Sequence, residues 1–283
     1  MRNLSAQKIS ETVRDLCIEA NTVLRGDVLE ALTRAARRER STKARGILKI
    51  LIENAAAARR QRLAICQDTG VACVYAEIGQ DVHIAGGDLE KAINEGVRLG
   101  YRQGYFRDSI VDPLTRKNTG DNTPAVIHTR IAAGGKVRLT VIPKGFGCEN
   151  KNQVKMFRPT AARGEVIDFI VEVVRVAGPD ACPPFVIGVG IGGTMEKAVE
   201  LSKEALLKKV TGQKQKNKSV NQMRLLEKEL LRRINKLGIG PSGLGGETTA
   251  LAVNVLTHPT HIAGLPVAVS IGCHAMRSAT KVL

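Results

Sequence analysis

The stretch Cys66-Gln67-Asp68-Thr69-Gly70 joins the longest helical region of the sequence to its first clear strand. It sets a thiol, an amide, a carboxylate and a hydroxyl on consecutive residues, and the glycine after them permits a tight turn. A site that holds a metal centre and a polar substrate could use all four groups. The competing interpretation is an inert core thiol beside a turn, because free cysteines are often only packing residues.

Helical and strand patterns flank this stretch on both sides. Residues 5–23 and 28–63 have the helical spacing of apolar side chains, with an interruption near Ser41-Thr42. A strand is expected over 71–78, and Asp88 is expected to cap a helix that reaches Gly104.

Turn residues dominate the middle of the chain. The polar segment 105–124 is rich in Asp, Asn, Pro and Gly, which indicates a functional loop or, alternatively, a solvated linker. Residues 125–132 and 136–142 are expected to form a hairpin around Gly134-Gly135. In segment 143–151, glycines could bring backbone N–H groups close to an anion or simply end the strand.

The second half alternates helices and strands. Gly188, Gly190 and Gly193 fit the G-x-G-x-x-G pattern between a strand and a helix, but the acidic residue expected about 20 residues later is missing. The lysine-rich segment 208–219 stands there instead, and we expect it to be an exposed loop. We therefore favour close strand–helix packing over NAD binding for these glycines. The expected helices cover 165–176, 195–209 and 220–237, and the expected strands cover 185–189, the residues up to Val255, and 266–271.

The composition is that of a globular protein, with 43% of the 283 residues hydrophobic, 25% charged and 3% aromatic. No internal repeat or linker marks a boundary, so we expect a single mixed α/β domain over residues 1–283. No apolar run has the length of a bilayer-spanning helix, and the first residues lack the core of a signal peptide. We therefore expect a cytoplasmic protein.

The formal net charge is +16, which would suit nucleic acid, an acidic partner protein or an anionic substrate. The basic residues are spread along helices, and few aromatic side chains are available to stack on bases. A basic RNA-binding protein is therefore the more remote alternative.

Six cysteines occur and none forms a C-x-x-C pair, which excludes a zinc ribbon or a thioredoxin-type motif. Cys17 and Cys73 fall in helical and strand patterns, and we expect them to be packing residues. Cys66, Cys182 and Cys273 stand at the ends of elements, beside Pro, Gly or polar residues. Thiolates from such distant segments could converge on one metal cluster.

Six motifs in a fixed order carry a family resemblance: Ile65–Gly70, Asn118–Pro124, Lys144–Asn150, Cys182–Pro184, Gly238–Gly246 and Thr257–His274. Together they resemble the iron–sulfur-dependent (class I) fumarate hydratases and the related L-tartrate dehydratases. The likeness is to the α subunit of the two-chain form, which is equivalent to the N-terminal domain of the single-chain form. It implies a mixed α/β fold with helices packed around small β-sheets.

The resemblance implies that Cys66, Cys182 and Cys273 hold a 4Fe–4S cluster. Three protein thiolates leave one iron without a protein ligand. That open position would bind a substrate oxygen as a Lewis acid.

The same resemblance assigns substrate contacts. Asp68 is placed for proton transfer at the substrate hydroxyl, and Gln67 contacts the substrate. Arg107 matches the carboxylate-binding arginine, and Gly147 would offer its backbone N–H to a carboxylate. His261 would hydrogen-bond the substrate, although it also lies in a His-x-x-His pair that could bind zinc or be structural.

The family takes the base that removes the carbon-bound proton from its β portion, and the chain ends soon after Cys273. We therefore expect a β subunit as partner, in an α2β2 assembly. Fumarate is the expected substrate and L-tartrate the alternative, because segments 118–124 and 145–150 look more fumarase-like. Cys148 departs from the family pattern, where a small residue such as Ser is usual.

Overall fold

A computed structural model describes residues 2–210 and 218–283, and its internal contacts divide the chain into two compact units. The first unit contains Met1–Arg25, Asn54–Phe146 and Arg277–Leu283; the second contains Gly26–Glu53 and Gly147–Met276. Each unit has a hydrophobic core of its own. The mixed α/β fold class is confirmed, whereas the single domain expected over 1–283 stays a prediction.

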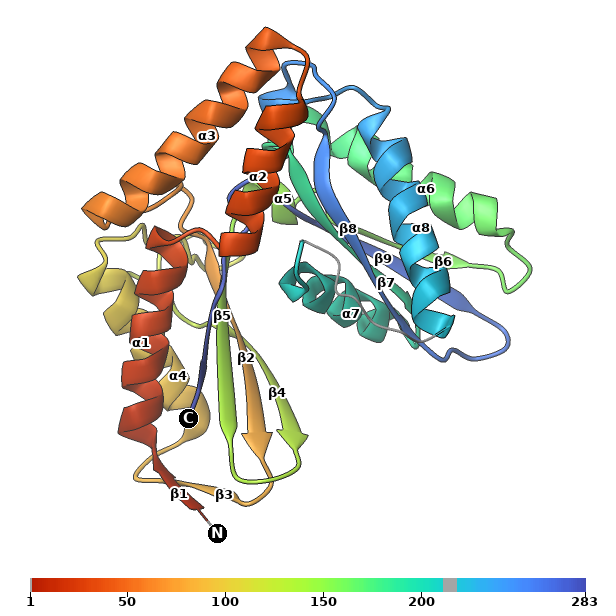
Figure 1. Cartoon of the computed structure of the whole chain (residues 1–283). Helices are drawn as coiled ribbons and strands as arrows, with labels where there is room; N and C mark the ends of the chain where they lie inside the picture. Colours follow the sequence, from red (N-terminus) through yellow and green to blue (C-terminus); the bar gives the residue numbers. More distant parts are fainter. Residues whose placement is uncertain (1, 211–217) are drawn as a thin grey trace. The chain divides into compact units, whose positions relative to one another are not determined.

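A four-stranded sheet in the order β10-β5-β2-β4 forms the centre of the first unit. Helices α1 (Ala6–Thr22) and α4 (Leu89–Gln103) pack together beside this sheet (Figure 1). A short parallel pair, β1 (Arg2–Ser5) with β3 (Val82–Ala85), completes the unit. The strands of the main sheet are β2 (Val71–Gly79), β4 (Val126–Ala132), β5 (Val137–Lys144) and β10 (Ala279–Val282).

Both helices of the first unit begin where the sequence predicted. The Ser5 side chain accepts the Lys8 N–H at 3.2 Å, and the Asp88 side chain accepts the Lys91 N–H at 2.9 Å. Each cap satisfies a backbone donor that has no partner within its own helix. The helices approach closely because α4 carries glycine at the contact: a Cβ on Gly96 would lie 2.5 Å from the Ser10 carbonyl oxygen.

The predicted hairpin around Gly134-Gly135 is wrong, although both of its strands form. β2 lies between them, parallel to β4 and antiparallel to β5. The connection from β4 to β5 crosses the end of β2, where the Gly79 N–H donates to the Lys136 carbonyl at 2.8 Å. β2 is buried on the helix-facing side, and a central position satisfies its backbone on both edges.

The second unit is a four-stranded sheet, in the order β6-β9-β7-β8, with helices on both faces. α6 and α8 contribute to the core on one face, and α7 packs against β7 on the other (Figure 1). The helices are α2 (Gly26–Arg38), α6 (Arg163–Ala177), α7 (Met195–Leu207) and α8 (Lys218–Asn235), and α3 (Thr42–Gln61) runs from this unit into the first. The strands are β6 (Gln153–Phe157), β7 (Phe185–Gly192), β8 (Ala250–His258) and β9 (Leu265–Gly272). The short helices are α5 (Phe146–Glu149), η1 (Gly178–Ala181) and η2 (Pro241–Gly243).

The glycines of the G-x-G-x-x-G pattern serve close packing, as the sequence predicted. A Cβ on Gly188 would lie 2.0 Å from the Ser202 carbonyl oxygen, and one on Gly190 would lie 2.0 Å from the Ala198 carbonyl oxygen. Both carbonyls belong to α7. Glycine at these two positions therefore lets α7 lie directly against β7.

Replacing Gly190 by Ala should lower the free energy of unfolding by about 1–3 kcal/mol, because the added methyl group has no room against α7. Denaturant unfolding followed by circular dichroism measures this loss. Gly164→Ala, on α6 of the same unit, is the matched control, since a Cβ there meets nothing within 4 Å. Equal stability of the two variants would contradict the packing role.

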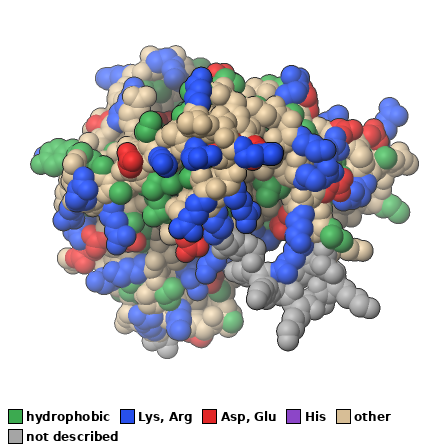
Figure 2. Space-filling model, turned by 45° about the horizontal axis from the view of Figure 1, so that its top comes forward, with side chains coloured by type: hydrophobic (Ala, Val, Ile, Leu, Met, Phe, Trp, Pro, Cys, Tyr) green, Lys and Arg blue, Asp and Glu red, His purple; other side chains and the backbone are tan. Residues whose placement is uncertain are grey.

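On the face that Figure 2 shows, basic side chains are numerous and acidic side chains lie among them. Arg163 pairs with Glu229 at 2.7 Å, for example. Of the lysine-rich loop expected over 208–219, residues 211–217 lie outside the described part of the chain. Within the described residues, no helix has the length and apolarity needed to cross a membrane.

Candidate active site

The segment from Cys66 to Gly70 connects α3 to β2 in the first unit, and both of its flanks are anchored. The Ile65 N–H donates to the Asn21 carbonyl at 2.9 Å, and the Asn54 side-chain amide donates to the Ile65 carbonyl at 2.9 Å. Ile65 itself is buried. Cys66 therefore follows a fixed point of the chain.

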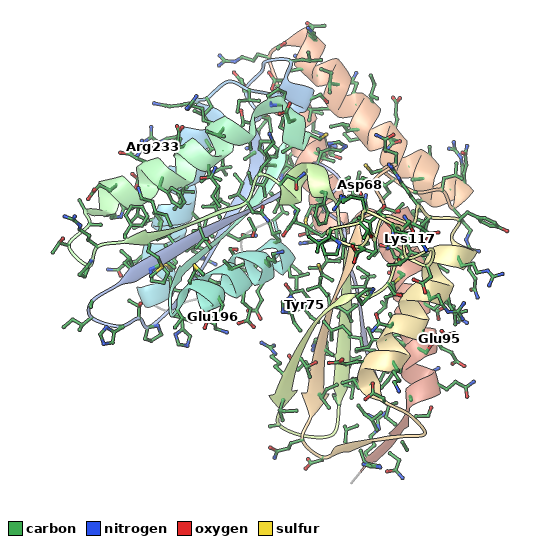
Figure 3. The ribbon with its side chains drawn as sticks, turned by 180° about the vertical axis from the view of Figure 1, so that it is seen from behind. Asp68, Tyr75, Glu95, Lys117, Glu196 and Arg233 are labelled. Atoms are coloured by element: carbon green, nitrogen blue, oxygen red, sulfur yellow. The ribbon has the colours of Figure 1, made fainter. Side chains whose placement is uncertain are left out.

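Asp68 is held by backbone groups on both carboxylate oxygens. Oδ1 accepts the Gly70 N–H at 3.0 Å, and Oδ2 accepts the Phe146 N–H at 2.8 Å. Gly70 has a φ of +72°, and a Cβ there would lie 2.6 Å from the Lys144 carbonyl, so glycine is required for this turn. Two N–H groups leave further lone pairs on the carboxylate, so Asp68 is oriented and its oxygens can accept further hydrogen bonds. Figure 3 shows Asp68 towards one end of the first unit, with Tyr75 and Glu95 farther along it.

Buried polar side chains hold the residues that follow Asp68. The Tyr101 hydroxyl donates to the Thr69 carbonyl at 2.7 Å, and the Asn122 amide donates to the Gly70 carbonyl at 3.1 Å. Burial raises the pKa of Tyr101 well above its ordinary value, so the phenol remains a neutral donor. Tyr101 was not predicted as a site residue, because its only signal in the sequence is a lone polar group on the buried face of a helix.

The polar segment 105–124 is tied to the Asp68 turn and is not a solvated linker. The Thr69 hydroxyl accepts the Arg107 N–H at 3.1 Å and donates to the Arg107 carbonyl at 3.2 Å. Asn122, which holds Gly70, also accepts the Ser109 N–H at 2.7 Å. The structure therefore brings together three predicted site residues, Gln67, Asp68 and Arg107, and the side chains of Gln67 and Arg107 are exposed.

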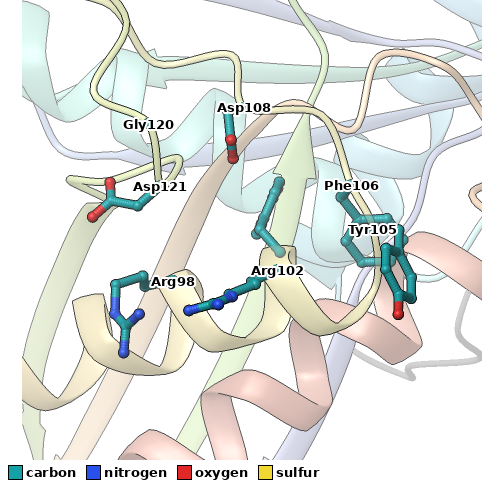
Figure 4. A pocket seen from close by; sticks show the side chains of 8 residues that line it. Arg98, Arg102, Tyr105, Phe106, Asp108, Gly120 and Asp121 are labelled. Atoms are coloured by element: carbon teal, nitrogen blue, oxygen red, sulfur yellow. The ribbon is translucent and has the colours of Figure 1, made fainter.

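A cavity of about 350 Å³ opens beside the same loop (Figure 4). Arg98 and Arg102 of α4 line it, together with Asp108 and Asp121 of the loop. The hydrogen bond to Glu95 is the main reason that the pKa of Arg98 is raised. Because Gln67, Asp68 and Arg107 do not line this cavity, it is distinct from the predicted substrate contacts.

In the second unit, the fold brings Cys182 and Cys273 to the same end of the sheet. Cys182 precedes β7 and Cys273 follows β9, and these strands are antiparallel with Val186 opposite Gly272. The His274 N–H donates to the Cys182 carbonyl at 3.2 Å, and His274 Nδ1 lies 3.1 Å from the same oxygen. Cys182 is exposed, Cys273 is partly buried, and Cys182 has a φ of +57°.

Cys148, the residue that departs from the family pattern, lies beside this pair. It is buried, and its Sγ donates to the Ala181 carbonyl at 3.2 Å, one residue before Cys182. Gly147 is exposed in the first turn of the short helix α5. A Cβ on Gly147 would make only an ordinary contact, 3.6 Å from the Asp180 carbonyl oxygen, so packing does not require glycine there.

His261 lies at the opposite end of the second unit's sheet from Cys273. It falls in the turn between β8 and β9, where Gly192 at the end of β7 pairs with His258. The eight residues of β9 separate that turn from Cys273, a length of about 25 Å. Cys273 directly follows a strand, as expected, whereas His261 lies within a turn, and within this unit the fold does not bring them together. Among the described residues, no group of three or more His, Cys, Asp or Glu side chains gathers to hold a metal ion.

Comparison with known proteins gives one family over almost the entire chain. The family described as fumarate hydratase (Fumerase) matches residues 10–282. A Methanocaldococcus jannaschii protein, provisionally named L(+)-tartrate dehydratase subunit alpha, is 39% identical over 282 residues, covering 97% of each chain. Proteins named L(+)-tartrate dehydratase subunit alpha in Escherichia coli K12 and Shigella sonnei are each 28% identical over 280 residues, covering 98% of this chain and 91% of theirs.

Proposed function

The chain belongs to the fumarate hydratase family, and from this premise we propose that it is the α subunit of an iron–sulfur hydro-lyase that interconverts L-malate and fumarate. The observation that carries the proposal is the Asp68 turn. A carboxylate held by two N–H groups stands there next in sequence to Gln67, the Arg107 backbone is bonded to the neighbouring Thr69, and Gln67 and Arg107 are both exposed. A hydroxy-dicarboxylate needs both a proton-transfer group and a cation in its site.

We propose that Cys66, Cys182 and Cys273 hold a 4Fe–4S cluster. Soft thiolates suit iron, and the approach of Cys182 to Cys273 in the second unit supports two of the three ligands. Such a cluster, when bound, would supply a Lewis acid that polarises a substrate oxygen.

The chain's own residues bind the substrate and move one proton. The Arg107 guanidinium binds a substrate carboxylate through two parallel N–H···O hydrogen bonds, and Gln67 donates a further hydrogen bond to the substrate. Gly147 is proposed to add a backbone N–H. Loss of water from malate breaks the C2–O and C3–H bonds, and Asp68 gives its proton to the departing hydroxyl to form water. The hydrogen bond from His261 to the substrate stays a prediction. The position of His261 in the second unit, at the opposite end of the sheet from Cys273, does not support it.

The C3 proton needs a base, and we propose that a β subunit contributes it. The word alpha in the relatives' names supports such a partner, and the +16 charge suits an acidic one. We further propose an α2β2 assembly in the cytoplasm.

L-tartrate is the second candidate substrate, because the relatives carry the name L(+)-tartrate dehydratase. Tartrate differs from malate by one hydroxyl on C3, so the same carboxylate and hydroxyl contacts serve both. Parallel assays of kcat/KM on L-malate and L-tartrate decide between them.

Purified anaerobically without its partner, the α chain should show no hydro-lyase activity, because the C3 base is absent. Co-expression with the β chain should give an iron-containing complex that forms fumarate from malate or oxaloacetate from tartrate. Activity of the α chain alone, equal to that of the complex, would contradict the two-chain proposal. An iron-free but fully active complex would contradict the cluster.

A further inference from the structure

A buried arginine that the sequence analysis did not single out lies beside the Asp68 turn. Arg277 belongs to the first unit, just before β10, and only 4% of its surface is exposed. Its Nη2 donates to the main-chain carbonyl of Asp68. A guanidinium in such a place needs an explanation, because burying an ionised side chain is unfavourable unless it is paired.

Ion pairing does not explain the burial of Arg277. Its Nε is buried and has no hydrogen-bond partner within the described part of the chain. No ion pair with an Asp or Glu of residues 2–210 or 218–283 involves it either. The one hydrogen bond that Arg277 makes within those ranges goes to the peptide of the residue proposed to transfer the proton.

This contact completes a series along the turn. The carbonyls of Asp68, Thr69 and Gly70 each accept a buried side-chain donor, from Arg277, Tyr101 and Asn122 respectively. The carboxylate of Asp68 is held separately by the N–H groups of Gly70 and Phe146. Arg277 is therefore the side chain that fixes the peptide carrying the Asp68 carboxylate.

We propose that Arg277 is a positioning residue of the hydro-lyase site, which holds the Asp68 peptide so that its carboxylate meets the substrate hydroxyl. This inference rests on the proposed function. Arg277 itself is not required to contact the substrate. Its removal should therefore impair the proton transfer more than substrate binding.

The test measures kcat and KM of the αβ complex with Arg277→Met and Arg277→Lys. The Met variant should lose about 10²-fold in kcat, since a small displacement of a reacting group has an effect of this size, with KM changed less than about threefold. The Lys variant keeps one donor and should recover part of the loss. A raised KM at unchanged kcat would instead make Arg277 a carboxylate ligand and overturn the inference.

A double-mutant cycle with Asp68→Asn tests whether Arg277 acts through Asp68. In the Asp68→Asn background, Arg277→Met should change kcat by less than about threefold, because the group being positioned is already gone. Additive losses would overturn the inference. If the Met variant fails to fold, the cycle with Arg277→Lys gives the same discrimination.

Arg2→Met is the matched control. Arg2 also donates a guanidinium N–H to a backbone carbonyl, that of Gly135 at 2.8 Å, but from an exposed position. It should leave kcat, KM and iron content unchanged. A wild-type complex without hydro-lyase activity would reject the proposed function, whereas an active complex with unaffected Arg277 variants would reject only this inference.

Discussion

Replacement of Cys182 or Cys273 by Ser is expected to remove the bound iron and abolish hydro-lyase activity in the αβ complex. A hydroxyl is a much poorer ligand for iron than a thiolate, and two remaining cysteines would leave the cluster short of ligands. Cys66→Ser should have the same effect. Iron analysis and the visible absorbance of anaerobically purified protein measure the loss independently of the assay.

Cys148→Ser is the matched control for this prediction. Cys148 lies beside Cys182, yet its thiol donates to the Ala181 carbonyl, and a serine hydroxyl can replace that hydrogen bond. The variant should keep its iron and its activity. If Cys148→Ser loses iron while Cys182→Ser keeps it, the ligand assignment is wrong and Cys148 takes the place of Cys182.

Asp68→Asn is expected to reduce kcat by about 10²–10⁴-fold, the usual contribution of a positioned acid–base group. The amide cannot exchange a proton at the substrate hydroxyl. In the wild type, the N–H groups of Gly70 and Phe146 donate to the two carboxylate oxygens. In the variant, one of these N–H groups faces the NH2 group of the asparagine, so two donors oppose each other. Steady-state kinetics on malate measure the loss, and iron content and thermal unfolding report whether the fold survives.

Asp112→Asn separates this catalytic effect from the general effect of losing a turn carboxylate. Asp112 accepts the N–H groups of Leu114 and Thr115 at 3.0 and 2.7 Å in the exposed part of segment 105–124. Those hydrogen bonds are the main reason that its pKa is lowered. The control should leave kcat within about twofold of wild type. Equal losses in both variants would remove Asp68 from the proposed chemistry.

The elements of this fold were predictable wherever the chemistry is local. Ser5 and Asp88 cap helices because their side chains reach N–H groups three residues later. Gly188 and Gly190 were correctly assigned to packing, because the chain lacked the acidic residue of a dinucleotide site. The short edge strands β1, β3, β6 and β10 were missed, since each has only four or five residues and little apolar pattern.

Errors arose where partners are distant in the chain. β4 and β5 are neighbours in sequence, but β2 takes the place between them. The sequence does not tell which end of β9 lies near Cys182. Only the antiparallel pairing of β9 with β7 decides that Cys273, and not His261, lies at the end of the sheet where Cys182 stands. No sequence pattern pointed to Arg277, because its partner, Asp68, stands 209 residues earlier.

The sequence by itself determined the family, the mixed α/β class and the identity of the groups at the Asp68 turn, because side-chain chemistry and short-range hydrogen bonding are properties of neighbouring residues. The tertiary structure alone decided which strands pair, which cysteines approach each other and which buried donors hold that turn. These contacts depend on how the apolar faces of helices and strands pack against one another. The same set of local helix and strand preferences is compatible with more than one such packing. The roles of Tyr101, Asn122 and Arg277 as donors to three consecutive carbonyls therefore became visible only in the tertiary structure.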